Sequence, residues 1–251
     1  MRNETAYRLS WGWTARFLGA ALLARPRSFA ADAREALAGI HPAPEMPGGE
    51  HVPPRGPCLV TCNHYTRPGF PAWWLALTIT ATVAARRAVD ADAEIHWVMT
   101  AAWTFPGSPW RQRWLTPLTR WAFRRVARVY GFVPMPPMPP DPREVEARAQ
   151  AVRQTLRLAR QLAPLGGMIG LAPEGRDVPG GLGRPPAGAG DFIALLVREG
   201  FPVLPVGVSE ADGRLRVAFG PSFMPEIPPR RAERDAVVAG QVMEAIARLT
   251  T

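Results

Sequence analysis

The 251-residue sequence contains no lysine, so arginine supplies all 30 of its basic side chains. Only 21 acidic residues oppose them, and the net charge at neutral pH is +9. A basic excess favours anionic partners, which include phospholipid surfaces, nucleic acids and phosphorylated substrates. The high proline and glycine contents and the use of arginine for lysine are also expected from genomic base bias. We therefore discount part of the charge as a functional signal.

Cysteine and histidine are scarce. Cys58 and Cys62 lie four residues apart on one expected strand, where they point to the same face. Their separation along an extended chain is too great for an undistorted disulfide, so we expect reduced core residues. The four histidines show no His-Glu-x-x-His or other metal-ligand spacing. The sequence therefore indicates no metal.

Long hydrophobic runs are also missing. No uninterrupted apolar run reaches the ~18 residues of a membrane span, and residues 72–85 come nearest. Arg16 interrupts the apolar segment 11–24, and no small-residue cleavage pattern follows, which argues against a secretory signal. We expect a cytoplasmic protein that lies peripherally on the inner face of the membrane.

Two familiar enzyme motifs are absent as well. There is no Gly-x-Ser-x-Gly elbow, which argues against a serine hydrolase. The glycine-rich loop 180–190 contains no Gly-x-Gly-x-x-Gly and does not resemble a P-loop.

The chain is organised around residues 56–70, which read GPCLVTCNHYTRPGF. Residues 58–62 are short, β-branched and apolar, which is typical of a strand buried on both faces. The strand ends at Asn63 and His64, and Pro71 then opens a helix. A histidine at the tip of a buried strand is well placed to act as a base. An isolated histidine in this position would more simply satisfy a backbone carbonyl.

A second buried strand pattern, residues 167–172, also ends in polar residues, at Glu174, Arg176 and Asp177. Ligands of open α/β sheets bind outside the carboxyl ends of the strands. Two strands that deliver charge at the same end therefore predict one shared site. We expect the two strands to be neighbours or near-neighbours, with His64 and Glu174 opening into one cleft.

Asn63-His64, Pro173-Glu174-Gly175 and the later strand 201–208 resemble the blocks of the glycerolipid acyltransferase family, over about residues 9–223. The departures are specific. The family has Asp five residues after its histidine, where this chain has Gly69. Its second block normally ends in arginine, where residues 131–135 end in Pro and Met. Its third block reads Glu-Gly-x-Arg, whereas here the arginine comes one place early.

The resemblance implies transfer of a fatty acyl group from acyl-coenzyme A or acyl-carrier protein to a hydroxyl of a lysophospholipid or glycerol phosphate, with no cofactor. His64 is the expected base, and Asp177 is the candidate replacement for the missing carboxylate, with Asp191 a weaker one. Backbone amides near residues 71–73 or in the 174–175 turn are candidates to face the oxyanion. The expected substrate-binding residues are Asn63, Arg67, Glu174, Gly175 and Arg176.

Two other classes of function remain as alternatives. One is a catalytically degenerate relative that binds lipid or acyl chains without transfer. The other is a nucleic-acid-binding protein, which only the charge supports, because no nucleic-acid-binding motif is present. We therefore expect no nucleic-acid partner.

The fold class expected is α/β, a single domain with a mixed, mostly parallel sheet flanked by helices. Residues 1–40 form an N-terminal amphipathic helical segment, and 41–251 form the acyltransferase-like domain. We expect strands at 95–100 and 130–133, and a helix that starts at the Thr116-Pro117 pair. Further helices are expected at 145–163, 187–198 and 230–251, with a hairpin turn at 212–213.

An anionic membrane surface is an expected partner. Trp11, Trp13 and Phe17 suit a helix at a membrane interface, although docking of that helix on the domain's own core is equally compatible. A stripe of arginines on the later helix is usually a solvated face, but beside tryptophans it suits anionic lipid as well. The stripe consists of Arg113, Arg120, Arg124 and Arg128.

Overall fold

The computed structural model describes residues 7–88, 91–105, 107–137, 142–176, 178–179, 182–211 and 213–251. The helices are α1 (Trp11–Leu23), α2 (Phe29–Ala38), α3 (Trp73–Arg86), α4 (Pro109–Tyr130), α5 (Val145–Leu162), α6 (Ala189–Arg198) and α7 (Arg231–Ala247), with short 3-10 turns η1 (Gly49–His51), η2 (Pro142–Glu144) and η3 (Ala163–Leu165). The strands are β1 (Cys58–Cys62), β2 (Tyr65–Thr66), β3 (Ile95–Thr100), β4 (Val133–Met135), β5 (Met168–Leu171), β6 (Val178–Pro179), β7 (Val203–Ala211) and β8 (Arg214–Phe219).

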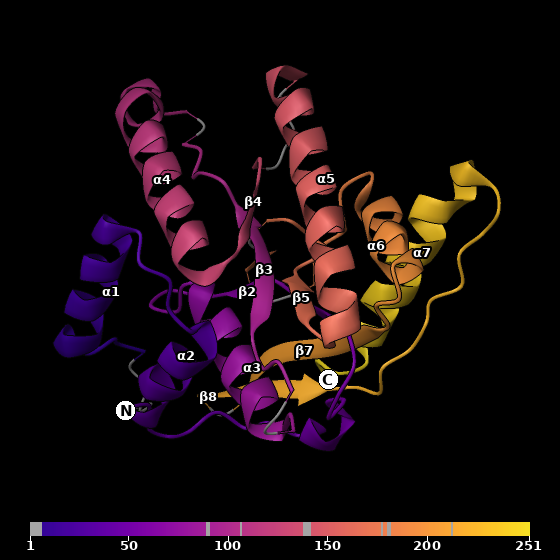
Figure 1. The fold of residues 1–251 in the computed structure, drawn as a ribbon, viewed down its shortest axis with the longest axis horizontal. Helices are drawn as coiled ribbons and strands as arrows, with labels where there is room; N and C mark the ends of the chain where they lie inside the picture. Colours follow the sequence, from indigo (N-terminus) through magenta and orange to yellow (C-terminus); the bar gives the residue numbers. More distant parts are fainter. Residues whose placement is uncertain are drawn as a thin grey trace.

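A six-stranded sheet runs through the molecule in the order β4-β3-β5-β1-β7-β8 (Figure 1). The first five strands pair in parallel, and β8 returns antiparallel to β7. Helices cover both faces (Figure 1). The expected α/β class with a mixed, mostly parallel sheet is therefore confirmed.

Two apolar layers flank the sheet because side chains alternate along each strand. Cys58, Val60 and Cys62 pack into the layer that contains α2 and α3. Leu59 points the other way, into the layer formed with α5, α6 and α7. Both cysteines are buried and free, as expected. All five residues of β1 are buried, which makes this strand the centre of the core.

The N-terminal helices join this core. Phe29 and Ala33 of α2 are buried in the same layer as α3, and α1 packs beside α4. Trp13 corrects part of the membrane expectation, because it is 7% exposed and its indole N–H donates to the Asp32 carbonyl at 3.2 Å. Phe17 also packs against the core, and only Trp11 of the three expected aromatics faces outward. The boundary at residue 40 stays a prediction.

Helix α4 begins earlier than expected. It starts at Pro109, and Pro117 lies inside it. The Ser108-Pro109 pair offers the same start signal as Thr116-Pro117, so the local pattern could not choose between them. An internal proline removes one helical hydrogen bond and does not stop this helix. The expected strand at 130–133 is likewise shifted, because Tyr130 ends α4 and β4 covers Val133–Met135.

The other expected elements are found close to their predicted places. Strand β3 has the predicted bounds, and α5, α6 and α7 fall within a few residues of theirs. The hairpin of β7 and β8 also forms. Residue 212, which the sequence places in its turn, lies outside the described residues.

Candidate functional site

The site is built where two parallel strands end side by side. Thr61 of β1 pairs with Leu171 of β5, which confirms that these strands are neighbours. The segments that follow them stay together, because Tyr65 and Thr66 of β2 pair in parallel with β6. The loop after His64 and the loop after Glu174 are thus held against each other at the carboxyl edge of the sheet, where ligand sites of such sheets lie.

Glu174 links the two loops directly. Its side chain is almost completely buried, and one carboxylate oxygen accepts a hydrogen bond from the backbone N–H of His64. The other oxygen accepts from the backbone N–H of Gly183. From the sequence, Glu174 was expected to be among the substrate-binding residues. In the structure both of its oxygens are used by backbone groups 110 and nine residues away.

Burial raises the pKa of Glu174 above its ordinary value, because a charged carboxylate loses solvation there. The two backbone N–H donors, and the electrostatic interactions with His64 and Arg176, oppose this rise. Because the pKa of Glu174 is raised on balance, folding favours the protonated form of this side chain.

Asn63 and His64 occupy the end of β1 in different ways. The Asn63 side chain is buried, accepts a hydrogen bond from the Val208 N–H at 2.7 Å and donates to the Val208 carbonyl at 2.9 Å. This pair ties β1 to β7. The His64 side chain is half-buried, and Glu174 fixes its backbone. Of the two, His64 is the residue whose side chain can serve chemistry at this edge.

Arg67 is held by an acid that sequence reasoning missed. Its Nε donates to Glu210 near the end of β7, and the Tyr65 hydroxyl donates to the same carboxylate at 2.9 Å. The guanidinium carbon lies 5.9 Å from the ring centres of Tyr7 and Phe70. Burial, followed by the nearby Glu210 charge, raises the pKa of Tyr7 to about 12. Because β7 runs parallel to β1, the strand-end rule would have pointed to Glu210.

Gly69 lies at a turn that explains its identity. Arg67, Pro68, Gly69 and Phe70 form a β-turn closed by the Phe70 N–H and the Arg67 carbonyl at 3.0 Å. The φ of Gly69 is 78°, and proline precedes it, which is the pattern of a type II turn. A Cβ at Gly69 would meet no atom within 4 Å. Space for a side chain therefore exists, and backbone conformation is the constraint.

The third block presents Gly175 and Arg176 on the surface, both exposed. The Gly175 N–H donates to the Ala172 carbonyl at 3.1 Å, so this amide closes the turn and cannot also face an oxyanion. Asp177, our candidate for the missing carboxylate, lies outside the described residues. Asp191, the weaker candidate, lies in the first turn of α6, and its Oδ1 lies 3.9 Å from Arg234.

Neither a metal site nor a membrane span is found in the part of the chain that the structure describes. No group of three or more histidine, cysteine, aspartate or glutamate residues is placed there to hold a metal ion. None of the described helices is both long and apolar enough to cross a membrane.

No protein-family model matches the sequence, and no curated protein sequence matches it. The chain is similar in structure to the 1-acyl-sn-glycerophosphate (LPA) acyltransferase PlsC from Thermotoga maritima, at 16% identity and a TM-score of 0.47. The alignment covers 95% of this chain and 88% of that one.

Proposed function

We propose that the protein is an acyltransferase that moves a fatty acyl group to a hydroxyl of a lysophospholipid or glycerol phosphate. The donor is acyl-coenzyme A or acyl-carrier protein, and His64 is the base. One observation carries this proposal: Glu174 accepts a hydrogen bond from the His64 backbone. The two blocks that resemble acyltransferase motifs, far apart in sequence, thereby meet at the ends of β1 and β5.

In the proposed reaction His64 removes the proton of the acceptor hydroxyl while the hydroxyl oxygen attacks the thioester carbonyl carbon of the acyl donor. The tetrahedral intermediate then collapses, the carbon–sulfur bond breaks, and His64 returns its proton to the leaving thiolate. Arg67 and Arg176 bind the acceptor phosphate, a task for which the guanidinium geometry is suited. Glu210 orients Arg67 for this role, and Glu174 keeps the two loops in register.

A second candidate function is lipid or acyl-chain binding without transfer. The observation that favours it is Gly69, which places no carboxylate five residues after His64. An orienting carboxylate is worth about 10⁴ in turnover in a comparable triad. Asp177 is our proposed replacement, and the degenerate alternative follows if nothing replaces it.

The test is acyl transfer from labelled acyl-coenzyme A and acyl-carrier protein to a panel of lysophospholipids and glycerol phosphate. We expect His64→Ala to lower turnover by about 10²–10⁴, the usual contribution of a general base. His51→Ala is the matched control, because His51 is exposed on η1. Equal activity of wild type and His64→Ala would contradict the proposed role.

Gly69→Asp separates the two candidate functions. If the acyltransferase geometry is present, the new carboxylate should restore or raise transfer, while Gly69→Ala carries the same backbone strain without the acid. No transfer by wild type or by Gly69→Asp, with any donor and acceptor, would favour lipid binding without catalysis.

We also propose that the protein is cytoplasmic and binds peripherally to the inner face of an anionic membrane. Helices α1 and α4 support this proposal, because they lie side by side and expose tryptophan and leucine together (Figure 1). The acceptor lipid would reach the site from this surface.

A further inference from the structure

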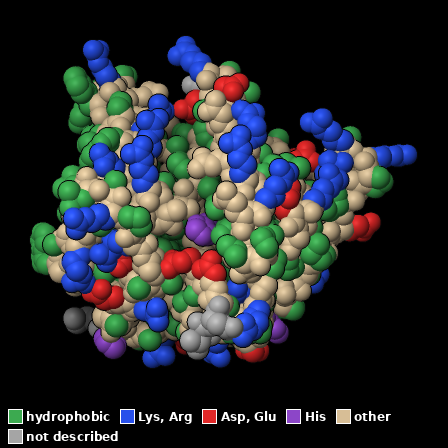
Figure 2. Space-filling model, in the orientation of Figure 1, with side chains coloured by type: hydrophobic (Ala, Val, Ile, Leu, Met, Phe, Trp, Pro, Cys, Tyr) green, Lys and Arg blue, Asp and Glu red, His purple; other side chains and the backbone are tan. Residues whose placement is uncertain are grey.

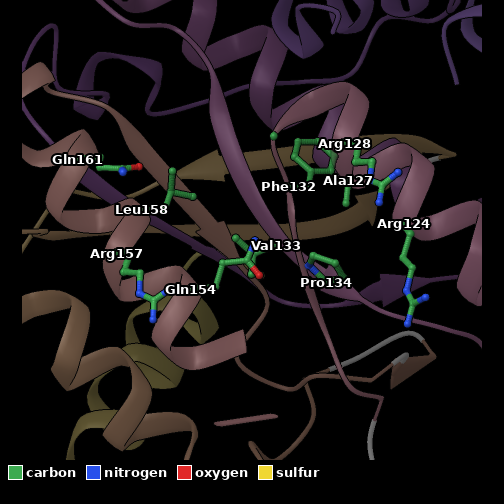
Figure 3. A pocket seen from close by; sticks show the side chains of 11 residues that line it. Arg124, Ala127, Arg128, Phe132, Val133, Pro134, Gln154, Arg157, Leu158 and Gln161 are labelled. Carbon is green, nitrogen blue, oxygen red and sulfur yellow. The ribbon is translucent and has the colours of Figure 1, made fainter. Parts of the chain in front are cut away.

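A groove of about 450 Å³ lies between α4 and α5, above the edge strand β4 (Figure 3). Strands β3 and β5 separate β4 from β1, and none of the expected site residues lines the groove. Its size is within the range of small-molecule sites. Figure 2 shows basic side chains along both sides of the hollow between these helices. The proposed acyl transfer does not use this groove.

Three guanidinium groups line the groove, Arg124 and Arg128 from α4 and Arg157 from α5 (Figure 3). No acidic residue is among its lining residues, and α4 contains none at all. Within the described parts of the chain, the structure records no ion pair or hydrogen bond for these three side chains. The groove therefore concentrates positive charge that nothing described nearby neutralises.

Neighbouring arginines on the same helices behave differently. Arg120 lies 2.9 Å from Glu144, Arg153 lies 3.4 Å from Glu146, and Arg160 lies 2.7 Å from Glu199. The pairing of these arginines shows that acids from α5 and from neighbouring segments reach arginines on both helices. Arg128 also lies in the last turn of α4, where its charge complements the helix dipole. Arg124 and Arg157 lie outside the last turns, so the dipole does not explain them.

The other residues that line the groove include both polar and apolar side chains. Gln154 and Gln161 add side-chain amides that can donate to an anion. Phe132, Val133 and Leu158 add an apolar surface between the two basic walls. The groove thus offers cationic donors and a hydrophobic floor to the same ligand.

We propose that this groove binds an organic phosphate, with the phosphate held by Arg124 and Arg128 on one wall or by Arg157 on the other, and with its apolar body on Phe132 and Leu158. A phosphate presents several oxygens and up to two negative charges, which matches several planar guanidinium forks better than a single carboxylate does. The same chemistry occurs in a lipid headgroup and in a soluble nucleotide, and binding measurements distinguish these sources.

The experiment is isothermal titration calorimetry of the full chain at constant ionic strength. The probes are octyl phosphate below its micelle concentration, adenosine diphosphate, and inorganic phosphate, with octyl glucoside as the uncharged control. The groove variant is Arg124→Gln/Arg157→Gln. The matched control is Arg113→Gln/Arg153→Gln, which removes the same charge from the same two helices outside the groove.

We expect octyl phosphate or adenosine diphosphate to bind the wild type more tightly than inorganic phosphate, and octyl glucoside not to bind. The groove variant should lose about tenfold or more in affinity, because charge-assisted hydrogen bonds are lost. The control should change by roughly twofold or less, because salt screens distant charges. Preference for octyl phosphate identifies a lipid source, and preference for adenosine diphosphate identifies a soluble one.

The proposal is overturned if neither organic phosphate binds the wild type, or if both double variants weaken binding equally. A His64→Ala variant separates this groove from the acyl-transfer site. It should keep full affinity for the preferred probe whether or not the protein transfers acyl groups. Loss of binding in His64→Ala would place the ligand at the strand ends and would overturn the proposal.

Discussion

At the residue scale, Glu174 was expected from the sequence to bind substrate, and in the structure its carboxylate accepts hydrogen bonds from two backbone N–H groups. Its two oxygens accept from the N–H groups of His64 and Gly183. An amide side chain has only one acceptor oxygen, so glutamine can satisfy only one of these donors. A buried donor left unsatisfied costs about 1–3 kcal/mol.

We therefore expect Glu174→Gln to lower the free energy of unfolding by about 1–3 kcal/mol at pH 5. Because burial raises the pKa of Glu174 in the folded state, the stability it contributes is complete below its ordinary value of 4.5. That contribution is lost as pH rises through the folded-state pKa. The gap between wild type and variant in urea unfolding should therefore narrow from pH 5 towards pH 7.5.

Glu146→Gln is the control for this series, since Glu146 is largely exposed and should change stability by less than about 0.5 kcal/mol. A gap that stays constant or widens with pH would contradict the assigned direction.

At the scale of elements, Arg87 joins three loops at the opposite end of the sheet. Its side chain is buried and donates to the carbonyls of Asp92 at 3.0 Å, Pro53 at 3.2 Å and Gly56 at 2.9 Å. A fourth bond reaches Gly166, just before β5. Burial lowers the pKa of Arg87, since the charged form loses water, and the four carbonyls replace that hydration. One guanidinium thus connects the entries to β1, β3 and β5.

Arg87→Lys should lower the free energy of unfolding by about 2–4 kcal/mol, because an ammonium group has three donors and cannot reproduce the planar fork. Arg86→Lys is the matched neighbour, exposed at the end of α3, and should change stability by less than about 0.5 kcal/mol. Chemical denaturation of both variants measures the difference. Equal stability of the two variants would show that the four hydrogen bonds of Arg87 contribute no net stability.

At the scale of the whole molecule, α1 and α4 create one amphipathic surface. Trp11 is 87% exposed on α1, and Trp110 and Trp114 are 61% and 66% exposed on α4. Leu22 and Leu118 extend the apolar area. Exposed aromatic side chains beside arginines are typical of helices at an anionic membrane interface. Because Trp13 is buried and Phe17 is partly buried, α4 is the larger contributor.

In vesicle flotation we expect the protein to bind bilayers that contain phosphatidylserine and to lose binding as salt increases. Trp110→Ser/Trp114→Ser should weaken binding about tenfold or more, because two large apolar side chains leave the interface. Leu165→Ser/Met224→Ser removes apolar side chains that are exposed elsewhere and should have little effect. Equal recovery with neutral and anionic vesicles would contradict the proposed membrane surface.

The candidate site was partly readable from sequence because its residues follow strand ends. The apolar runs before His64 and Glu174 predicted two strands that are neighbours or near-neighbours, and β1 and β5 are adjacent. The partners could not be read in this way. Glu210 lies 143 residues from Arg67, and Val208 lies 145 residues from Asn63. Such pairs depend on which strands become neighbours, and local pattern contains no information about that.

The same division applies to the fold. Local pattern was enough to predict the buried strands, the α/β class, the hairpin and the reduced cysteines, because side-chain periodicity and glycine or proline punctuation act locally. The inward orientation of Trp13 and the start of α4 at Pro109 depended on tertiary packing, because the local pattern allowed two outcomes in each case. Tertiary packing also decided which arginines form ion pairs, since the separation of α4 and α5 leaves Arg124 and Arg157 facing a groove.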